Sequence, residues 1–313
     1  MSLIDLIQTS DDASAVAHAL MLAQALLDGP PDFGPRSFCY SSPHRGEISD
    51  YPSMPFGARF GVMGVGIVDE GTGLIPAVLK ISGKANRSLK LHEDDDVVMV
   101  VKASIRGGFD ILSNARIINI PPPEFEAVPG DSVSAALIGT AGVQINWGNG
   151  DDGILTAGHV GKPAGSTAKV GSINGSVDLS LDPTNNGKTP QADVAVIRLP
   201  APVASSQRIG RTTTAGPKDS ITVRSRSGKM INATIMGQMQ WLWMPSSNCT
   251  CGHVYMTTAH VTAKGDSGAP ALKSTDLIGH VIGASKGMTT YIQQIDYQLQ
   301  EIRNQSGFSS AVI

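Results

Sequence analysis

The chain has 313 residues, 41% of them hydrophobic and 16% charged, which is enough apolar content for a core and excludes a chain that is disordered by composition. The formal net charge of -3 excludes the basic footprint typical of nucleic-acid-binding proteins, so no nucleic-acid partner is expected. The 35 glycines and 19 prolines indicate many turns, which favours a mainly β fold over a helical bundle.

Targeting signals and cysteines bear on the compartment. Residues 1–6 contain no basic region ahead of an apolar run, so no secretory signal is expected. No apolar stretch of about 18 residues occurs, which predicts that no segment spans a membrane. The three cysteines, Cys39, Cys249 and Cys251, are too few and too uneven in number for a disulfide scaffold. Together these features predict a cytoplasmic protein without a membrane partner.

The first predicted element is a helical segment within residues 1–30. Apolar residues recur there at three- and four-residue spacing. Ser10 or Asp11 is expected to cap the longer part of the helix, and Gly29-Pro30-Pro31 ends it. The segment has no Lys or Arg, which disfavours a membrane-surface helix, so we expect it to pack on its own domain or on a second copy of the chain. The helix is therefore the predicted surface for a homo-oligomer.

Residues 31–122 are predicted to form a small, mainly β accessory domain. The apolar runs 61–68 and 74–81 flank a glycine-containing loop, as in a β-hairpin. The glycines Gly61, Gly64 and Gly66 lack the spacing of a nucleotide-binding loop. We interpret them as marks of a bulge or of close backbone approach.

The rest of the accessory domain is also predicted to consist of strands and turns. Further strands are expected at 87–92, 97–101 and 111–120. The acidic run at 93–96 is interpreted as a solvated turn rather than a cation site. The three prolines at 121–123 mark the best domain boundary in the chain.

The third region, residues 123–313, contains short strands separated by turns, as in a β-barrel, and holds three residues suited to nucleophilic catalysis. Ser267 lies in Gly265-Asp266-Ser267-Gly268, where glycines let peptide N–H groups converge on one point. A strand runs into His159 through small residues. Asp193 precedes an apolar strand, where a buried acid needs a partner such as a histidine N–H. Because a serine needs a base and the base an orienting group, the three form a candidate triad.

These segments resemble the active-site blocks of trypsin-like (chymotrypsin-fold) serine proteases of the compact bacterial type. Thr-Ala-Gly-His-Val at 156–160, Asp-Val-Ala at 193–195 and Gly-Asp-Ser-Gly at 265–268 match in sequence and in chain order, and the order differs from that of subtilisins and α/β-hydrolases. The resemblance covers about residues 128–305. It implies a double β-barrel serine endopeptidase that needs no cofactor and hydrolyses a protein or peptide substrate through an acyl-enzyme.

Residue by residue, the resemblance assigns roles within that mechanism. Ser267 would attack the scissile carbonyl, His159 would accept and return its proton, and Asp193 would orient the imidazole. The backbone N–H groups of Gly265 and Ser267 would form the oxyanion hole. Asp266 would brace this loop through an ion pair.

The resemblance also implies a specificity pocket. Val261, six residues before the serine, and Val281, in the strand after it, would line a small apolar substrate-binding pocket. An Arg or Lys preference is not expected, because trypsins carry an acid where this chain has Val261. His280 is the alternative, as a reader of Gln or Glu side chains, although strand alternation places it on the face opposite Val281.

Two further patterns have ordinary interpretations. Cys249-Thr250-Cys251-Gly252-His253 lacks the spacing of a zinc site, so we expect free thiols and no bound metal. Residues 289–304 are predicted to form a closing helix, with apolar residues from Ile292 to Ile302 on one face.

Two alternatives to an ordinary endopeptidase stay open at this stage. The chain could be a latent, protease-like scaffold that acts mainly by binding proteins. It could also process itself, with residues 121–128 as the first place to look for a cut.

Overall fold

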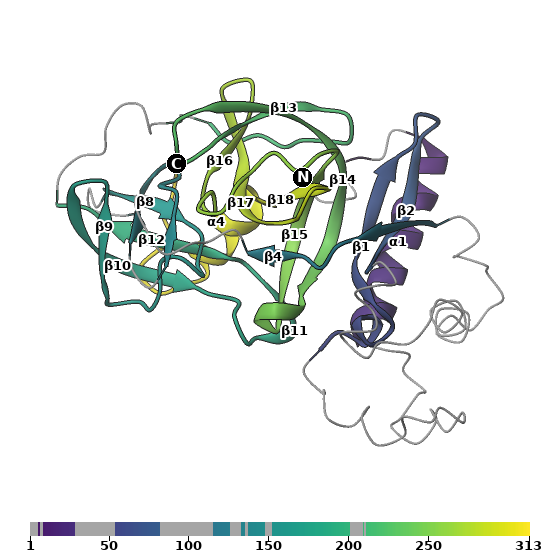
Figure 1. Cartoon of the computed structure of the whole chain (residues 1–313), viewed down its shortest axis with the longest axis horizontal. Helices are drawn as coiled ribbons and strands as arrows, with labels where there is room; N and C mark the ends of the chain where they lie inside the picture. Colours follow the sequence, from purple (N-terminus) through teal and green to yellow (C-terminus); the bar gives the residue numbers. More distant parts are fainter. Residues whose placement is uncertain are drawn as a thin grey trace, which may run out of the picture.

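The computed structural model describes residue 6 and residues 9–28, 54–81, 115–125, 133–134, 137–147, 152–200, 209 and 211–313. Cys39, the acidic run at 93–96 and the predicted strands at 87–92 and 97–101 lie outside the described residues. Figure 1 shows two bodies of strands side by side, with a helix and a strand pair at one end. The predicted mainly β, double-barrel fold preceded by a helix is confirmed.

The larger sheet contains a closed six-stranded barrel. Its strands follow in the spatial order β15 (Cys249–Thr257), β18 (Thr289–Gln294), β17 (Asp276–Ser285), β16 (Pro270–Lys273), β13 (Ser220–Arg224) and β14 (Met230–Met244). Pairing of β14 with β15 closes the barrel. β11 (Gly187–Gln191) lies parallel to β15 outside this ring, and η5 (Pro245–Ser247) joins β14 to β15.

The smaller sheet has seven strands and curls on itself. The spatial order is β6 (Ile138–Gly139), β5 (Val133–Ser134), β9 (Thr167–Val170), β10 (Ile173–Leu181), β12 (Val194–Arg198), β8 (Asp152–Thr156) and β7 (Gln144–Asn146). Its two edge strands, β6 and β7, are consecutive in the chain, so the sheet is wrapped around its own apolar core. β8 and β12 are buried on both faces: Ile154, Ala195 and Ile197 fill that core, and the residues that alternate with them pack in a second cluster with α4 (Ile295–Arg303).

The N-terminal elements extend the sheet of the larger barrel. β1 (Val62–Asp69) and β2 (Leu74–Ile81) form the predicted hairpin, η3 (Phe56–Phe60) precedes β1, and β3 (Arg116–Ile120) lies parallel to β2. β1 pairs with residues 237–242 of β14, beyond the part of β14 that pairs with β13. The proposed division of the chain at residues 30 and 122 stays a prediction. What the structure adds is a single apolar core that includes residues on both sides of those boundaries.

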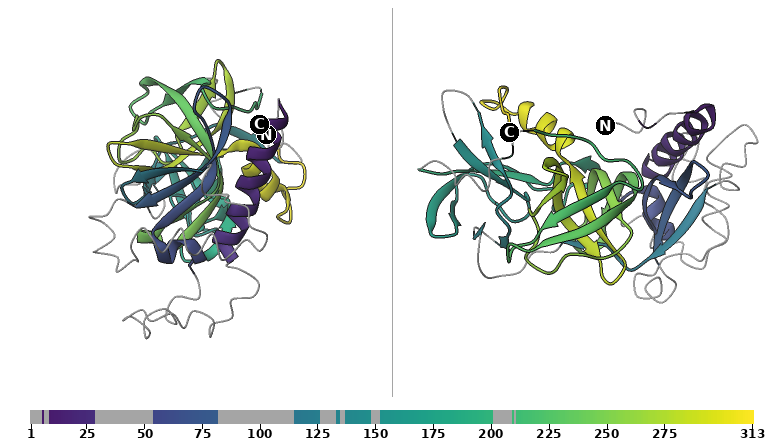
Figure 2. Two further views of the ribbon diagram at one scale, coloured as in Figure 1. Left: turned by 90° about the vertical axis from the view of Figure 1, so that its right-hand side faces the viewer. Right: turned by 90° about the horizontal axis from the view of Figure 1, so that it is seen from above.

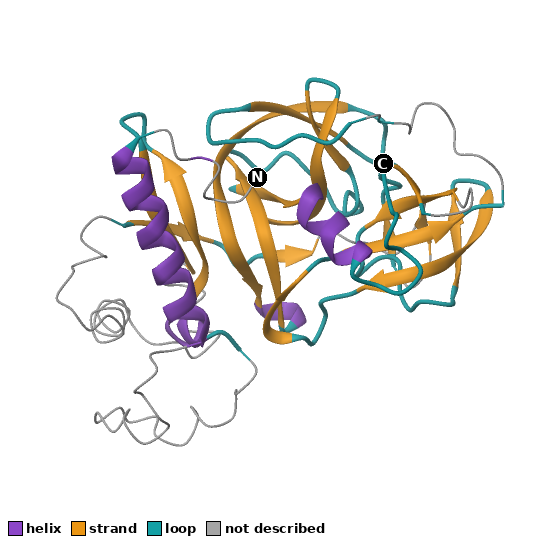
Figure 3. Ribbon diagram, turned by 180° about the vertical axis from the view of Figure 1, so that it is seen from behind, coloured by secondary structure: helices purple, strands orange, loops and turns teal. Residues whose placement is uncertain are grey.

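Helix α1 (Ser10–Asp28) covers one face of this N-terminal layer, as Figures 2 and 3 show. Leu22 and Leu26 are buried in the core that also contains Val65 and Trp241. The indole N–H of Trp241 donates a 2.9 Å hydrogen bond to the carbonyl of Ala23. The apolar face that prompted the homo-oligomer prediction is thus covered by the chain's own sheet, and oligomerisation stays a prediction.

The start of α1 differs by one residue from expectation. Thr9, not Ser10 or Asp11, makes the cap: its hydroxyl accepts the N–H of Asp12 at 3.1 Å, and a carboxylate oxygen of Asp12 accepts the N–H of Thr9 at 3.1 Å. The other oxygen of Asp12 accepts the N–H of Leu74, which ties the helix start to β2. Within the described part of the chain, none of the helices has the length and apolar character needed to cross a membrane.

The glycines of β1 mark close backbone approach, as interpreted from the sequence. A Cβ added at Gly66 would lie 1.8 Å from the carbonyl oxygen of Gln238 in β14. The pairing register shifts between Val65 and Gly66, which is a β-bulge. Any side chain at Gly66 would therefore separate β1 from β14.

The predicted closing helix over 289–304 is wrong in its first third. Residues 289–294 form β18, which hydrogen-bonds to both β15 and β17, and the helix α4 spans only Ile295–Arg303. The β-branched and aromatic run Thr-Thr-Tyr-Ile at 289–292 suits a buried strand, and the barrel supplies partners on both edges. Ile295, Leu299 and Ile302 pack with residues of the smaller sheet, so α4 lies at the junction of the two barrels (Figure 3).

Candidate active site

Two predicted triad members meet because their strands are neighbours. His159 lies in the turn after β8, and Asp193 lies directly before β12; the two strands pair antiparallel, with Ala195 opposite Thr156. The imidazole Nδ1 of His159 is 2.7 Å from Oδ2 of Asp193. The backbone N–H of His159 donates to Oδ1 at 2.8 Å. Because a carboxylate only accepts, Nδ1 carries the proton, which leaves Nε2 of a neutral ring as the proton acceptor.

A buried amide network holds Asp193 from behind, and sequence reasoning missed it. The Oε1 atom of Gln293 in β18 accepts the N–H of Asp193 at 2.7 Å. The Nε2 group of Gln293 donates to the carbonyls of Gln191 at 3.0 Å and Gly252 at 2.8 Å. Gln298 of α4 donates to the carbonyl of Asp193 at 3.3 Å. The available signal was a set of glutamines in an otherwise apolar C-terminal stretch.

His280 lies at the far end of this network. Its Nδ1 lies 2.9 Å from Oε1 of Gln298, and its side chain is fully buried. Since the amide group of Gln298 is already used as a donor, Oε1 accepts and Nδ1 donates. Burial lowers the pKa of His280 to about 4, so the ring is neutral near pH 7. The structure places His280 among protein groups and not at an open pocket.

The loop that carries Ser267 is held from the smaller barrel. Gly265 and Gly268 have φ values of 99° and 89°, a region that favours glycine. The N–H of Thr140 donates to the carbonyl of Ser267 at 2.7 Å, and its hydroxyl donates to the carbonyl of Gly265 at 2.8 Å. The N–H groups of Gly265 and Ser267 donate to none of the described residues. Thr140 therefore fixes the carbonyls of this loop.

Asp266 braces the same loop through hydrogen bonds to backbone amides. Its Oδ1 accepts the N–H of Arg226 at 2.7 Å, and its Oδ2 accepts the N–H of Ala263 at 2.9 Å. The expectation of a brace is met, but with peptide N–H groups where an ion pair was expected. A buried carboxylate is satisfied well by two such donors.

Three buried side-chain atoms in and near the candidate triad lack hydrogen-bond partners. Among the described residues, the buried side-chain atoms without a hydrogen-bond partner are His159 Nε2, Ser267 Oγ and His280 Nε2. A buried polar atom without a partner costs about 1–3 kcal/mol, so each one calls for an explanation. The first two are therefore not hydrogen-bonded to each other, so the contact between base and nucleophile that a triad needs is not made among the described residues.

An aromatic ring lies directly on the histidine. Phe125 of β4 (Glu124–Phe125) stacks on His159 with ring centroids 3.9 Å apart and planes 14° apart. The strand β4 is paired with β17, so the ring is held by backbone hydrogen bonds rather than by a free tail. His159 is 1% exposed and Ser267 is 0% exposed. An aromatic residue soon after the proline run was the only signal in the sequence.

The predicted specificity residues lie in one apolar cluster. Val281 is fully buried in the larger barrel, and the partly buried Val261 packs against the same cluster. The backbone N–H of Val261 donates to the hydroxyl of Thr290 at 3.1 Å. Their assignment to a substrate pocket stays a prediction.

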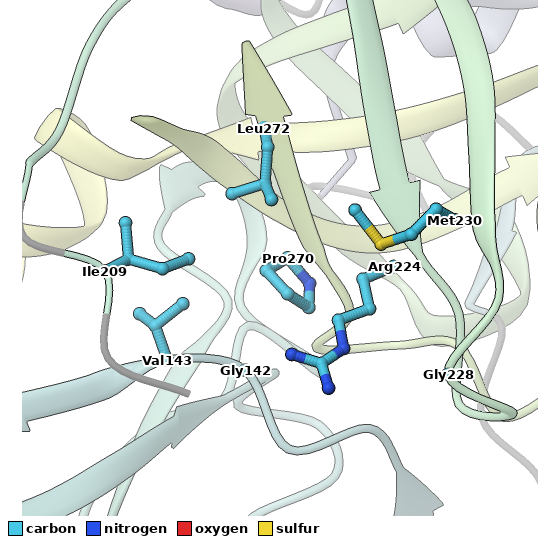
Figure 4. Close-up of a pocket in the computed structure, with 8 residues that line it drawn as sticks. All are labelled: Gly142, Val143, Ile209, Arg224, Gly228, Met230, Pro270 and Leu272. Atoms are coloured by element: carbon cyan, nitrogen blue, oxygen red, sulfur yellow. The ribbon is translucent and has the colours of Figure 1, made fainter. Parts of the chain in front are cut away.

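A pocket of about 270 Å³ lies elsewhere, where the barrels meet (Figure 4). In Figure 4 the guanidinium of Arg224 lies beside Pro270, which is three residues after Ser267. Neither Val261 nor Val281 lines it. The lining residues are Gly142, Val143, Ile209, Arg224, Gly228, Met230, Pro270 and Leu272.

The two cysteines of β15 belong to the core. Cys249 and Cys251 are buried free thiols in the cluster that contains Trp241. The pKa of Cys251 is raised well above its usual range, mainly by a side-chain hydrogen bond with Cys249 and, as the second cause, by burial. His253 packs on Tyr297 with ring centroids 4.5 Å apart. No group of three or more metal-ligating side chains occurs among the residues with described positions.

Comparison with known proteins identifies the family to which the chain belongs. The model of the family described as Trypsin matches residues 141–297, half of the chain, and so the chain belongs to the trypsin family of serine proteases. No curated protein sequence matches the chain.

Three solved structures that resemble the chain are proteases. Nocardiopsis protease is 20% identical, covering 55% of this chain and 94% of its own, with a TM-score of 0.44. Thermobifida fusca protease A is 20% identical, covering 58% and 93%, with a TM-score of 0.41. Cellulomonas bogoriensis chymotrypsin is 22% identical, covering 55% and 93%, with a TM-score of 0.40.

Proposed function

We propose that this chain is an active serine endopeptidase that works through His159, Asp193 and Ser267. The observation that carries the proposal is the pair of hydrogen bonds that His159 donates to the carboxylate of Asp193, from Nδ1 at 2.7 Å and from the backbone N–H at 2.8 Å. These hydrogen bonds set the tautomer in which Nε2 accepts the proton of a nucleophile. Membership of the trypsin family supports a protein or peptide as the substrate.

The chemistry follows from the groups around Ser267. Nε2 of His159 removes the hydroxyl proton while Oγ of Ser267 attacks the scissile carbonyl, which forms a tetrahedral oxyanion. The N–H groups of Gly265 and Ser267 donate to this oxyanion, an effect of about 3–4 kcal/mol per donor in an analogous enzyme. The protonated histidine then gives its proton to the leaving amine, and water hydrolyses the acyl-enzyme by the reverse sequence.

The apolar character of Val261 and Val281 supports a small uncharged side chain as the preferred residue before the scissile bond. Homo-oligomerisation through α1 and a cytoplasmic location remain predictions from the sequence. No nucleic acid or cofactor is required for the chemistry proposed.

Labelling with a fluorophosphonate probe tests the proposal. Wild type and Ser267→Ala are incubated with the probe, and their intact masses are recorded. We expect one adduct on wild type and none on the variant, because only an activated serine reacts at a useful rate. Equal labelling of wild type and Ser267→Ala would contradict an active Ser267.

A further inference from the structure

The edge of β17 next to the nucleophile is occupied by the chain's own strand β4. β16 begins three residues after Ser267 and pairs with β17 up to His280. The loop stays against β17 beyond that point, because Gly268 N–H donates to the carbonyl of Val281 at 2.8 Å. β4 then pairs antiparallel with β17, with Phe125 opposite Gly283 and Glu124 opposite Ala284.

Several contacts hold β4 in this place. The hydroxyl of Ser285 donates to the carbonyl of Pro121 at 2.7 Å and lies 2.8 Å from the hydroxyl of Tyr291. A Cβ added at Gly283 would lie 2.2 Å from the carbonyl of Glu124. The absence of a side chain at Gly283 is therefore what lets another backbone approach β17 here.

The position of β4 blocks the chemistry proposed above. An extended peptide binds a sheet by adding a strand to a free edge, and this edge of β17 is already paired. The ring of Phe125 covers His159 at 3.9 Å, and the buried Ser267 and His159 cannot both contact a substrate while it stays there. A substrate strand and β4 compete for one edge.

We propose that β4 is a built-in inhibitor of the active site, and that a protein substrate must displace Phe125 and Glu124 from β17 before Ser267 can react. The inference rests on the proposed function. β4 follows β3, which is anchored on β2. The N-terminal layer therefore holds the inhibitory strand in register with the site, which gives that layer a role in regulation.

Two variants test the inhibitor separately from the nucleophile. Phe125→Ala removes the ring from His159 and keeps the backbone of β4; Glu124→Ala, at an exposed side chain, is the matched control. We expect Phe125→Ala to react with the fluorophosphonate probe and to cleave unfolded casein at least tenfold faster than wild type. Glu124→Ala should stay within twofold. Circular dichroism melting curves confirm that both variants are folded.

A disulfide staple provides the converse test. In the double variant Glu124→Cys, Ala284→Cys, the new thiols face one another across the β4–β17 pair. The oxidised protein, with the bond verified by mass, should cleave casein at least tenfold more slowly than the same protein after reduction. Oxidised and reduced forms of equal activity would overturn the proposal.

The outcomes separate the two proposals. Rapid labelling of wild type with no gain in Phe125→Ala would overturn the inhibitor and leave the protease intact. No labelling of wild type, Phe125→Ala or the reduced staple would overturn both. A Ser267-dependent cut between residues 125 and 133 would show that this part of the chain is a substrate, which also overturns the inhibitor.

Discussion

The side-chain oxygen of Gln293 accepts the backbone N–H of Asp193 at 2.7 Å, which places a residue of the larger barrel directly behind the acid of the smaller one. The side-chain amide of Gln293 donates its two N–H groups to the carbonyls of Gln191 and Gly252, which fixes the orientation of that amide. The acid that orients His159 is thus itself oriented by a side chain 100 residues away in sequence.

Gln293→Leu should therefore impair catalysis more than binding. The change leaves the buried N–H of Asp193 and the buried carbonyl of Gly252 unpaired, so the free energy of unfolding should fall by at least about 2 kcal/mol. We expect kcat to fall about tenfold with KM within twofold, because the shifted Asp193 acts in the transition state and not on bound substrate. Steady-state kinetics on a peptide substrate measure the split. Gln191→Leu is the control, because Gln191 is exposed and contributes only its carbonyl; an equal loss there would contradict the argument.

Asp193→Asn tests the tautomer. Both oxygens of Asp193 face N–H donors of His159, and the backbone donor cannot change. Asparagine must then turn its NH₂ toward Nδ1, which forces the proton to Nε2 and removes the base. We expect probe labelling to slow by about 10⁴-fold, the size of this effect in the family's template enzyme.

The control for that variant removes the same charge elsewhere. Asp178 forms an ion pair with Arg198, with 2.6 Å between the charged atoms, and neither residue belongs to the candidate triad. Asp178→Asn should therefore keep the wild-type labelling rate. A labelling rate for Asp193→Asn within tenfold of wild type would show that the histidine does not depend on this carboxylate.

Thr140→Val should loosen the nucleophile loop. Valine has nearly the same shape but no hydroxyl, so the carbonyl of Gly265 loses its 2.8 Å donor. We expect a loss of about 1–2 kcal/mol in the free energy of unfolding and slower labelling, because the oxyanion donors lie on the same loop. Thr140→Ser keeps the hydroxyl and should retain the wild-type labelling rate. If both variants label alike, the hydroxyl has no part in positioning the loop.

His280 should make the fold sensitive to acid. Its pKa is about 4 in the folded chain and 6.5 when unfolded, because burial penalises the charged ring. The unfolded state therefore binds more protons between these values, so stability is complete above pH 6.5 and falls as the pH drops toward 4. The full difference is about 3 kcal/mol.

Urea unfolding at several pH values checks this prediction. His280→Asn removes the titrating group while keeping a polar side chain. Its stability should change less than that of wild type between pH 7 and pH 4.5. Parallel curves for the two proteins would show that His280 does not titrate in this window.

Local sequence was enough to single out the candidate triad. Each residue of the candidate triad lies in a short segment with its own sequence pattern, so His159, Asp193 and Ser267 could be proposed without knowledge of tertiary contacts. The hairpin of β1 and β2 could also be predicted from local sequence, because a tight loop between two apolar runs specifies it.

The supporting residues could not be predicted, because their roles arise from contacts distant in sequence. Gln293 acts through Asp193, and Phe125 acts through its stacking on His159. The run at 289–294 has apolar residues that fit either a helix or a strand, and the strand is formed because β15 and β17 offer backbone partners on both sides.

The length of β14 has a practical consequence for protein production. One continuous strand pairs with β13 and β15 inside the barrel and with β1 outside it. A fragment trimmed to the family-matched residues 141–297 would expose the 237–242 edge, and it would uncover Trp241 where α1 now lies. An unpaired, apolar strand edge recruits other chains. Such a fragment should be recovered as aggregates even though it contains the whole candidate triad, and soluble expression will need the N-terminal layer.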